Sequence, residues 1–140
     1  MVPINYWAVI VSAIAAMGLG YVWYGPIFGE QWIALMGWSK AEMEAKMKEG
    51  VGPKYLLQAV GALLMAFVLA HSILFAGTYL KVAGVSAGLQ GAIWSWLGFI
   101  VPVSLGSVLW DGKPWKLWFI NAGYYLAVLI VMGLILSLWV

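Results

Sequence analysis

The sequence has no cysteine, no arginine and little charge of either sign. Without cysteine the chain has no disulfide, no thiolate nucleophile and no cysteine-based metal site. Its seven basic residues are all lysines and its net charge is only +2, so it lacks the guanidinium fork that suits phosphates and the basic field that attracts nucleic acid. Charged residues make up 9% of the chain, against roughly 25% in an average globular protein, so it cannot cover itself with polar surface.

Hydrophobic residues, by contrast, make up 65% of the 140 residues, and the chain has ten tryptophans and seven tyrosines. Rings that are apolar but carry a polar tip concentrate where membrane hydrocarbon meets the lipid headgroups. The composition therefore indicates a protein that lies in a lipid bilayer, and we expect the bilayer to be its main partner and nucleic acid not to be one.

Four long stretches contain no Asp, Glu or Lys, and His71 is their only residue that titrates near neutral pH. About twenty helical residues, at about 1.5 Å each, cross the roughly 30 Å of bilayer hydrocarbon. The stretches are residues 5–24, 55–79, 89–110 and 117–140. The sequence predicts an all-α integral membrane protein in which four transmembrane helices form a compact bundle, within one membrane domain over residues 1–140.

The lysines are distributed unevenly among the connections between these spans. The first connection carries Lys40, Lys46, Lys48 and Lys54, the last carries Lys113 and Lys116, and the middle one carries only Lys81. Short loops rich in lysine stay in the cytoplasm. We therefore expect the lysine-rich connections to be cytoplasmic and both chain ends to lie outside.

The first connection contains a helix signal of its own. Ser39 and Glu42 form the pattern of a capping box, which predicts an amphipathic helix over about residues 40–49 that lies along the membrane surface. Gly25-Pro26 is expected to end the first span, and residues 30–36 are the candidate for a second short interfacial helix.

Small residues recur at helical spacing within the spans. In lipid, helices associate through close approach at such residues. The positions are Ala8, Ser12, Ala16 and Gly20 in the first span, Ala62, Ala66 and Ala70 in the second, and Gly133 and Ser137 in the fourth. We expect these stripes to face other helices, and we expect Pro102 to kink the third span because proline lacks one helical amide.

Polar side chains fall at two depths when each span is measured from its end. The outer layer has Ser12, His71 and Ser95, and the inner layer has Gln58, Ser104, Ser107 and Asn121. Because an unpaired polar group is costly in hydrocarbon, His71 and Asn121 are predicted to face the bundle interior. His71 is either a proton-linked or ligand-binding residue, since histidine exchanges protons near neutral pH, or a neutral residue hydrogen-bonded to Ser12 or Ser95.

Asn121 also has two interpretations. It orients a polar solute together with Tyr124 and Tyr125, or it ties the third and fourth spans together through Ser104 or Ser107. The inner boundary of the first span adds Trp23, Tyr24 and Glu30. There, a carboxylate either guards an entrance or is simply exposed.

No constellation of catalytic residues is present in the sequence. It has no nucleophile with a base at workable spacing, no paired carboxylates within the spans and no phosphate-binding glycine loop. A haem or metal site would need ligands beyond His71. We therefore expect no enzymatic activity, no metal and no cofactor.

Several segments taken together resemble a known bacterial family. They are Asn5-Tyr6-Trp7-Ala8-Val9, Trp23-Tyr24-Gly25-Pro26-Ile27-Phe28-Gly29 with Trp32 after it, Ala70-His71, Gly106-Ser107-Val108-Leu109-Trp110-Asp111-Gly112-Lys113-Pro114, and Asn121-Ala122-Gly123-Tyr124. In order and spacing, over essentially the whole chain, they look like the family called domain of unknown function 1761. Tyr125 stands where the resemblance leads us to expect a polar residue or histidine. The resemblance implies four helices in a bacterial inner membrane and supplies no activity.

Three functions are compatible with these features. The first is a small homo-oligomeric membrane protein that binds or transports a small solute through an interior lined by His71, Asn121, Tyr124 and serines. The second is a non-catalytic accessory subunit of a larger membrane complex, whose polar residues serve only packing. The third is a membrane enzyme acting on lipid or quinone at the tryptophan-rich inner boundary. A hydrated cavity at His71 or Asn121 favours the first, a dry interior the second, and a headgroup-level pocket with Glu30 or Asp111 the third.

Overall fold

The computed structural model describes residues 3–139, and within that range the chain is built from helices without a strand. Four helical stretches are long and apolar enough to cross a membrane: Tyr6–Ile27, Gly52–Leu80, Gly84–Leu109 and Trp115–Leu138. They confirm the four predicted spans. The third begins at Gly84 rather than at residue 89, because the connection before it is a tight turn with left-handed backbone at Lys81 (φ 55°) and Gly84 (φ 57°).

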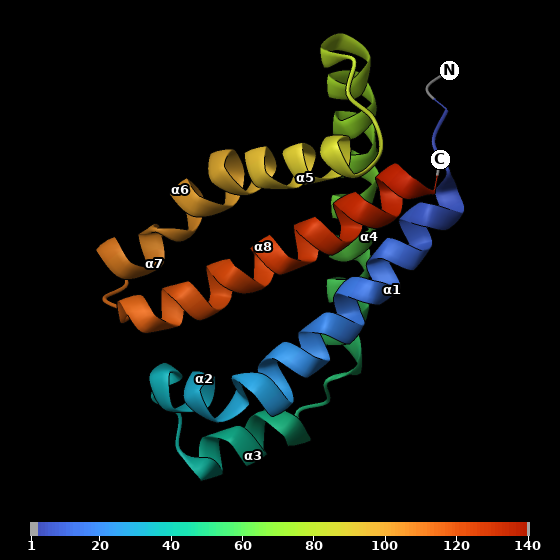
Figure 1. Cartoon of the computed structure of the whole chain (residues 1–140). Coiled ribbons are helices and arrows are strands. Elements are labelled where there is room, and N and C mark those ends of the chain that lie inside the picture. Colours follow the sequence, from blue (N-terminus) through green and yellow to red (C-terminus); the bar gives the residue numbers. More distant parts are fainter. Residues whose placement is uncertain (1–2, 140) are drawn as a thin grey trace.

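The helices are α1 (Tyr6–Val22), α2 (Gly29–Met36), α3 (Lys40–Lys48), α4 (Gly52–Leu80), α5 (Gly84–Ser95), α6 (Val101–Ser104), α7 (Gly106–Leu109) and α8 (Trp115–Leu138). Figure 1 shows α1 leading through the short helices α2 and α3 into the long α4, which stands at a steep angle to the α5–α7 segment and to α8. Two π-helical turns, Trp23–Ile27 and Trp96–Ile100, follow α1 and α5 directly.

The last helix, α8, is the centre of the arrangement. It packs against α1 on one side and α5 on the other and also contacts α4, while α4 contacts both α1 and α5. In Figure 1, α8 lies between α1 and the α5–α7 segment. Accordingly 44% of the most apolar stretch of α8 is buried, against 6% in the third span. Few residues of the third span are therefore fully buried within the chain.

The two ends of the helix arrangement differ in what they contain. At one end the first and last described segments meet, where the side-chain amide of Asn5 donates a hydrogen bond to the carbonyl oxygen of Trp139 (3.2 Å). The connection between α4 and α5 lies at this same end, which we call the terminal end. The opposite end carries α2, α3, the turn before α8 and six of the seven lysines, and we call it the lysine-rich end.

Both π-helical turns lie next to a proline. Pro26 is inside the first turn, and Pro102 follows the second within α6. Proline has no amide with which to bond the carbonyl oxygen four residues earlier, and a widened turn accommodates the missing bond. The predicted kink at Pro102 is thus confirmed, whereas the first span continues through Pro26 to Ile27 before it ends.

Small residues bring the helices together as predicted. The alanines and the serine of the stripes on α1 and α4 are all buried, namely Ala8, Ser12, Ala16, Ala62, Ala66 and Ala70. The closest approach is between α5 and α8, where a Cβ on Gly133 would lie 2.5 Å from the carbonyl oxygen of Gly88. Glycine at both positions is what allows these two backbones to touch.

The capping box at the start of α3 is confirmed. The Ser39 amide donates to the Glu42 carboxylate (2.7 Å), and the Ser39 hydroxyl accepts from the Glu42 amide (3.2 Å). These bonds satisfy two amides that a helix start otherwise leaves free. The helices α2 and α3 therefore exist, while their position along a membrane surface stays a prediction.

Candidate functional site

Two neighbouring clefts open at the lysine-rich end. The first, the tyrosine cleft, has a volume of about 450 Å³ and is lined by Met17, Gly20, Tyr21, Tyr24, Gly25, Pro26, Tyr55, Gln58, Tyr124 and Tyr125. The second, the tryptophan cleft, has a volume of about 780 Å³ and is lined by Tyr24, Trp32, Met36, Val103, Ser104, Gly106, Ser107, Trp110, Asp111, Trp118, Asn121 and Tyr125. Tyr24 and Tyr125 line both clefts and stand between them.

Tyr24 is held in this position by the π-helical turn and by a bond to α8. Its hydroxyl donates to the side-chain oxygen of Asn121 at 2.9 Å. Its ring lies 5.1 Å from that of Tyr124, which in turn lies 5.2 Å from that of Tyr125, with the planes tilted by 60° and 61°. Such tilted contacts are the preferred geometry of aromatic pairs, so the three rings form a rigid wall.

Tyr124 fits against α1 because Gly20 has no side chain. A Cβ on Gly20 would lie 2.9 Å from the Tyr124 hydroxyl. That hydroxyl donates to the carbonyl oxygen of Ala16 at 3.2 Å, and the side chain is buried. Gly20, a member of the small-residue stripe, thus leaves room for the Tyr124 side chain of α8 at the edge of the tyrosine cleft.

Three indole groups fasten the neighbouring segments to α8. The Trp23 indole N–H donates to the carbonyl oxygen of Ile120 (3.0 Å), and that of Trp96 donates to the carbonyl oxygen of Ala122 (2.7 Å). From α8 itself, the Trp118 indole N–H donates to the Ser104 hydroxyl (2.9 Å). Polar side-chain bonds therefore add to the packing at small residues in joining the helices at the lysine-rich end.

Trp23 is expected at this boundary from the sequence, whereas the bonds of Trp96 and Trp118 appear only in the structure. A signal for Trp96 was present, since Trp23-Tyr24-Gly25-Pro26-Ile27 and Trp96-Leu97-Gly98-Phe99-Ile100 share the spacing of Trp, Gly and Ile. Both stretches form π-helical turns, and π-helical turns are frequent at functional sites. The shared spacing therefore marks the two segments that deliver an indole to α8.

Charge is nearly absent from the walls of the two clefts. Asp111, in the turn before α8, is the single charged residue that lines them, and no lysine does. Two of the nearby lysines have partners elsewhere: the Lys46 ammonium lies 4.7 Å from the centre of the Trp38 ring, and that of Lys54 lies 3.7 Å from the Glu49 carboxylate. The clefts can therefore offer a ligand aromatic surface, a few polar groups and one carboxylate.

Glu30 lies outside this constellation. It is an exposed residue in the first turn of α2 and is not among the residues that line either cleft. This position agrees with the interpretation of Glu30 as an exposed carboxylate, and not with that of a residue guarding an entrance.

Part of the inner polar layer comes together, although not through the predicted bonds. Of the two interpretations of Asn121, the bond to Ser104 or Ser107 is not the one formed: the Tyr24 hydroxyl donates to Asn121, and the Trp118 indole donates to Ser104. The Ser107 hydroxyl instead donates to the Ser104 carbonyl oxygen at 2.8 Å. The long aromatic side chains of Tyr24 and Trp118 span a distance between helices that the shorter serine and asparagine side chains cannot. Asn121 and Ser104 therefore bond to these aromatic residues instead of to each other.

The outer polar layer does not come together. The predicted bond of His71 to Ser12 or Ser95 is wrong: its Nδ1 donates to the carbonyl oxygen of Phe67, one turn earlier on the same helix, at 2.8 Å. The Phe67 ring lies 4.4 Å from the His71 ring. Ser12 is fully buried and its hydroxyl has no hydrogen-bond partner among the described residues. Ser95 lines a separate cavity of about 220 Å³ between α4 and α5.

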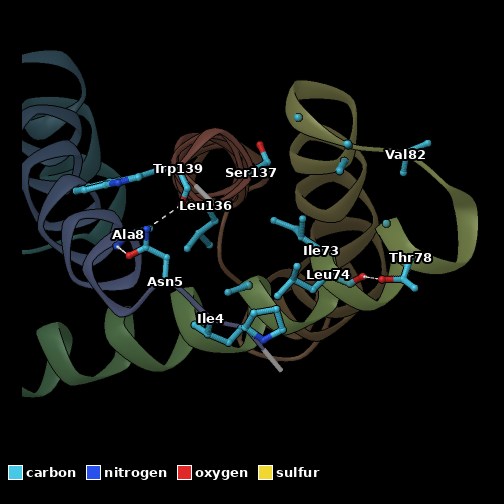
Figure 2. Close-up of a pocket in the computed structure, with 16 residues that line it drawn as sticks. Ile4, Asn5, Ala8, Ile73, Leu74, Thr78, Val82, Leu136, Ser137 and Trp139 are labelled. Carbon is cyan, nitrogen blue, oxygen red and sulfur yellow. Dashed lines mark hydrogen bonds between the residues drawn. The ribbon is translucent and has the colours of Figure 1, made fainter. Parts of the chain in front are cut away.

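The terminal end has a cavity of a different kind, with a volume of about 300 Å³. Figure 2 shows Ile4, Ile73 and Leu136 around its centre. Its polar residues are bonded within the protein, since the Thr78 hydroxyl donates to the Leu74 carbonyl oxygen (2.8 Å) and Asn5 donates to Trp139. Among residues 3–139, those that line this cavity are uncharged and mostly apolar.

Residues 3–139 contain no group of three or more His, Asp or Glu side chains placed to hold a metal ion.

Comparison with known proteins identifies a family without assigning an activity. A family model described as "Protein of unknown function (DUF1761)" matches residues 7–137. No curated protein and no solved structure matches the chain.

Proposed function

We propose, on the premise that this chain belongs to the DUF1761 family of proteins of unknown function, that it is a membrane protein that binds a small amphipathic solute at its lysine-rich end. The observation that carries this proposal is the pair of aromatic clefts that meet at Tyr24 and Tyr125. Sites for small molecules are typically clefts of roughly 300–1,000 Å³ with aromatic walls and few polar groups. Both clefts fall within that range.

The arrangement of polar groups in the clefts supports an amphipathic ligand. Gln58 is a polar group in the tyrosine cleft, and Asn121 and Ser107 are polar groups in the tryptophan cleft. An apolar part of the solute would pack against the rings, and its polar part would reach these groups. Since His71 is not among the lining residues, it has no part in this proposal.

The charge distribution supports an orientation for the protein. Six of the seven lysines lie at the end that carries the clefts. By the positive-inside rule this end faces the cytoplasm of a bacterial inner membrane, and the chain termini face outward. A solute would then meet the clefts at the cytoplasmic boundary of the bilayer.

The exposed third span supports a homo-oligomer. Only 6% of its most apolar stretch is buried within one chain, and Gly98, on that span, has open space around it. Because small residues favour close helix contact in lipid, this span is the candidate surface for a second copy. Passage of the solute through an oligomer interior is a further step of the same proposal.

The alternative is a non-catalytic accessory subunit of a larger membrane complex. It is favoured by the indole bonds of Trp23, Trp96 and Trp118, which use polar groups for packing within the chain. In that case the third span would contact a different protein, and the clefts would hold only lipid. Saturable binding of a solute distinguishes the two functions.

Quenching of tryptophan fluorescence in lipid nanodiscs tests the proposed binding. The probe is para-bromobenzyl alcohol, a neutral amphipathic solute whose bromine quenches indole emission. We expect a saturable component of quenching that Tyr125→Leu removes and His71→Ala leaves intact. Tyr125 lines both clefts, whereas His71 lines neither. Quenching that rises linearly with the probe, or that is identical in wild type and Tyr125→Leu, would contradict the proposal.

A further inference from the structure

We propose that the solute recognised by the two clefts is an organic cation with apolar substituents, of which a quaternary ammonium group is the simplest form. This inference rests on the proposed function and names the chemical class of its ligand. It follows from three properties of the cleft walls: their charge, their aromatic surface and the state of their hydrogen-bond acceptors.

The charge of the walls is opposite to that of the surrounding end. Six lysines lie at the lysine-rich end, which would favour an anionic ligand if their ammonium groups reached the clefts. None lines either cleft, and the single charged group that does is the carboxylate of Asp111. A cation that enters therefore meets a carboxylate and no lysine side chain on the walls.

The aromatic surface supplies the main attraction. The negative face of an aromatic ring attracts a cation, and tryptophan does so most strongly. Trp32, Trp110 and Trp118 line one cleft, and the mutually tilted rings of Tyr24, Tyr124 and Tyr125 border the other. The Trp38 ring already holds the Lys46 ammonium at 4.7 Å, so a cation over an indole is a contact that this end of the molecule uses.

The hydrogen bonds within the walls favour a cation without N–H groups. Asn121 accepts from Tyr24, and Ser104 accepts from Trp118. Each of these two oxygens has already taken one donor, and a primary ammonium group, which brings three donors of its own, would rely mainly on the Asp111 carboxylate. A quaternary ammonium group has no donor to satisfy, and its methyl groups pack against rings.

Binding of choline and of its neutral isostere, in which a tert-butyl group replaces the trimethylammonium group, tests this inference. The measurement is isothermal titration calorimetry of the whole chain in nanodiscs of phosphatidylethanolamine and phosphatidylglycerol. We expect choline to bind about fivefold more tightly than the isostere, as cation–aromatic contacts at partly exposed sites predict. The two molecules share size and shape, so the difference reports charge alone.

Two carboxylate variants provide a matched pair. Asp111→Asn is expected to weaken choline about threefold, as for an exposed ion pair, and to leave the isostere unchanged. Glu30→Gln removes a carboxylate from the same end but not from the cleft walls, and should change neither ligand. An equal loss in the two variants would mean that only the general charge of this end matters and would overturn the role of Asp111.

The outcomes also separate this inference from the proposed function. Equal binding of choline and isostere overturns cation recognition while solute binding stands. If neither choline nor the isostere binds but para-bromobenzyl alcohol still gives saturable quenching, cation recognition is wrong and the proposed function stands. If that quenching is absent as well, the proposed function is also wrong. A repeat in phosphatidylcholine nanodiscs distinguishes the source of the cation, because competition by the lipid weakens free choline only if headgroups occupy the clefts.

Discussion

The terminal end and the lysine-rich end hold the same helices together by opposite means. At the terminal end, α5 and α8 touch backbone to backbone at Gly88 and Gly133. At the lysine-rich end, Trp23 and Trp96 reach α8 with indole hydrogen bonds. Gly88 and Gly133 allow two backbones to touch, whereas the indoles of Trp23 and Trp96 reach α8 through hydrogen bonds. The indole bonds lie at the end that carries the two aromatic clefts.

The two cavities reflect this difference. The cavity at the terminal end is an apolar space whose Thr78 and Asn5 donors are bonded within the protein. The clefts at the lysine-rich end border rings, amides and a carboxylate. Among the described residues, the clefts are lined by a carboxylate and by a cluster of aromatic rings, and the proposed function therefore lies at that end.

The largest expected effect comes from adding one carbon where α5 and α8 touch. Gly133→Ala would place a Cβ 2.5 Å from the carbonyl oxygen of Gly88, so α5 and α8 must separate. We expect a loss of about 1–3 kcal/mol of unfolding free energy, the usual cost of overpacking, measured by thermal unfolding in detergent. Gly61→Ala in α4, where a Cβ meets nothing within 4 Å, should keep or raise stability by about 0.5–1 kcal/mol. Equal stability of the two variants would refute the backbone contact.

Removing two indole donors at the lysine-rich end should lower the free energy of unfolding by a similar or smaller amount. Trp23→Phe and Trp96→Phe each keep a ring and delete one hydrogen bond to α8. A hydrogen bond contributes about 0.5–1.5 kcal/mol, so the double variant should lose about 2 kcal/mol in denaturant unfolding. Trp7→Phe, at a ring 71% exposed, is the control and should change little. If Trp7→Phe costs as much as the double variant, the bridging role is wrong.

A double-mutant cycle on Tyr24 and Asn121 sharpens the comparison further. Tyr24→Phe and Asn121→Leu each break the 2.9 Å bond that stands between the two clefts. We expect the two losses in stability to be non-additive, with a coupling of about 1 kcal/mol. Additive losses would mean that the two groups do not interact.

The smallest effect is a pH dependence at α3. Hydrogen bonds from the Ser39 amide, and then from its hydroxyl, hold the pKa of Glu42 below its ordinary value. Because the folded pKa is lower than the unfolded one, this stabilisation is present above the ordinary pKa of glutamate and is lost as the pH falls through the folded value. The Glu42 amide resonance should follow this titration by NMR, and Glu42→Gln should abolish it. A titration at the ordinary pKa would contradict the capping box.

Elements with a simple spacing rule could be predicted from the sequence. The four spans follow from long uncharged stretches, and the capping box follows from Ser39 and Glu42 three residues apart. Pro102 predicted the kink because a missing amide acts locally. Each of these features depends on neighbours in the chain, which the sequence displays directly.

The contacts between helices could be predicted only in part. Depth along a span places Asn121 near Ser104. It does not give the rotation of each helix about its own axis, so it does not reveal that Tyr24 and Trp118 are their partners. One of the two alternatives for His71 was a hydrogen bond to Ser12 or Ser95 on another helix, whereas its Nδ1 bonds the carbonyl oxygen of Phe67, one turn away on its own helix. A side chain that can bond locally needs no partner elsewhere, and spacing in the sequence does not reveal which option is taken.

Cysteine labelling tests most directly the claim that the lysine-rich end is open to a solute. Because the sequence has no native cysteine, the reagent can react only with the introduced thiol. Gln58→Cys introduces a thiol on the wall of the tyrosine cleft, and Ser12→Cys introduces one at a fully buried position of α1. With a small cationic methanethiosulfonate reagent, we predict rapid labelling at position 58 that saturating para-bromobenzyl alcohol slows, and no labelling at position 12. Labelling at position 58 that is as slow as at position 12, or that the solute leaves unchanged, would contradict the account.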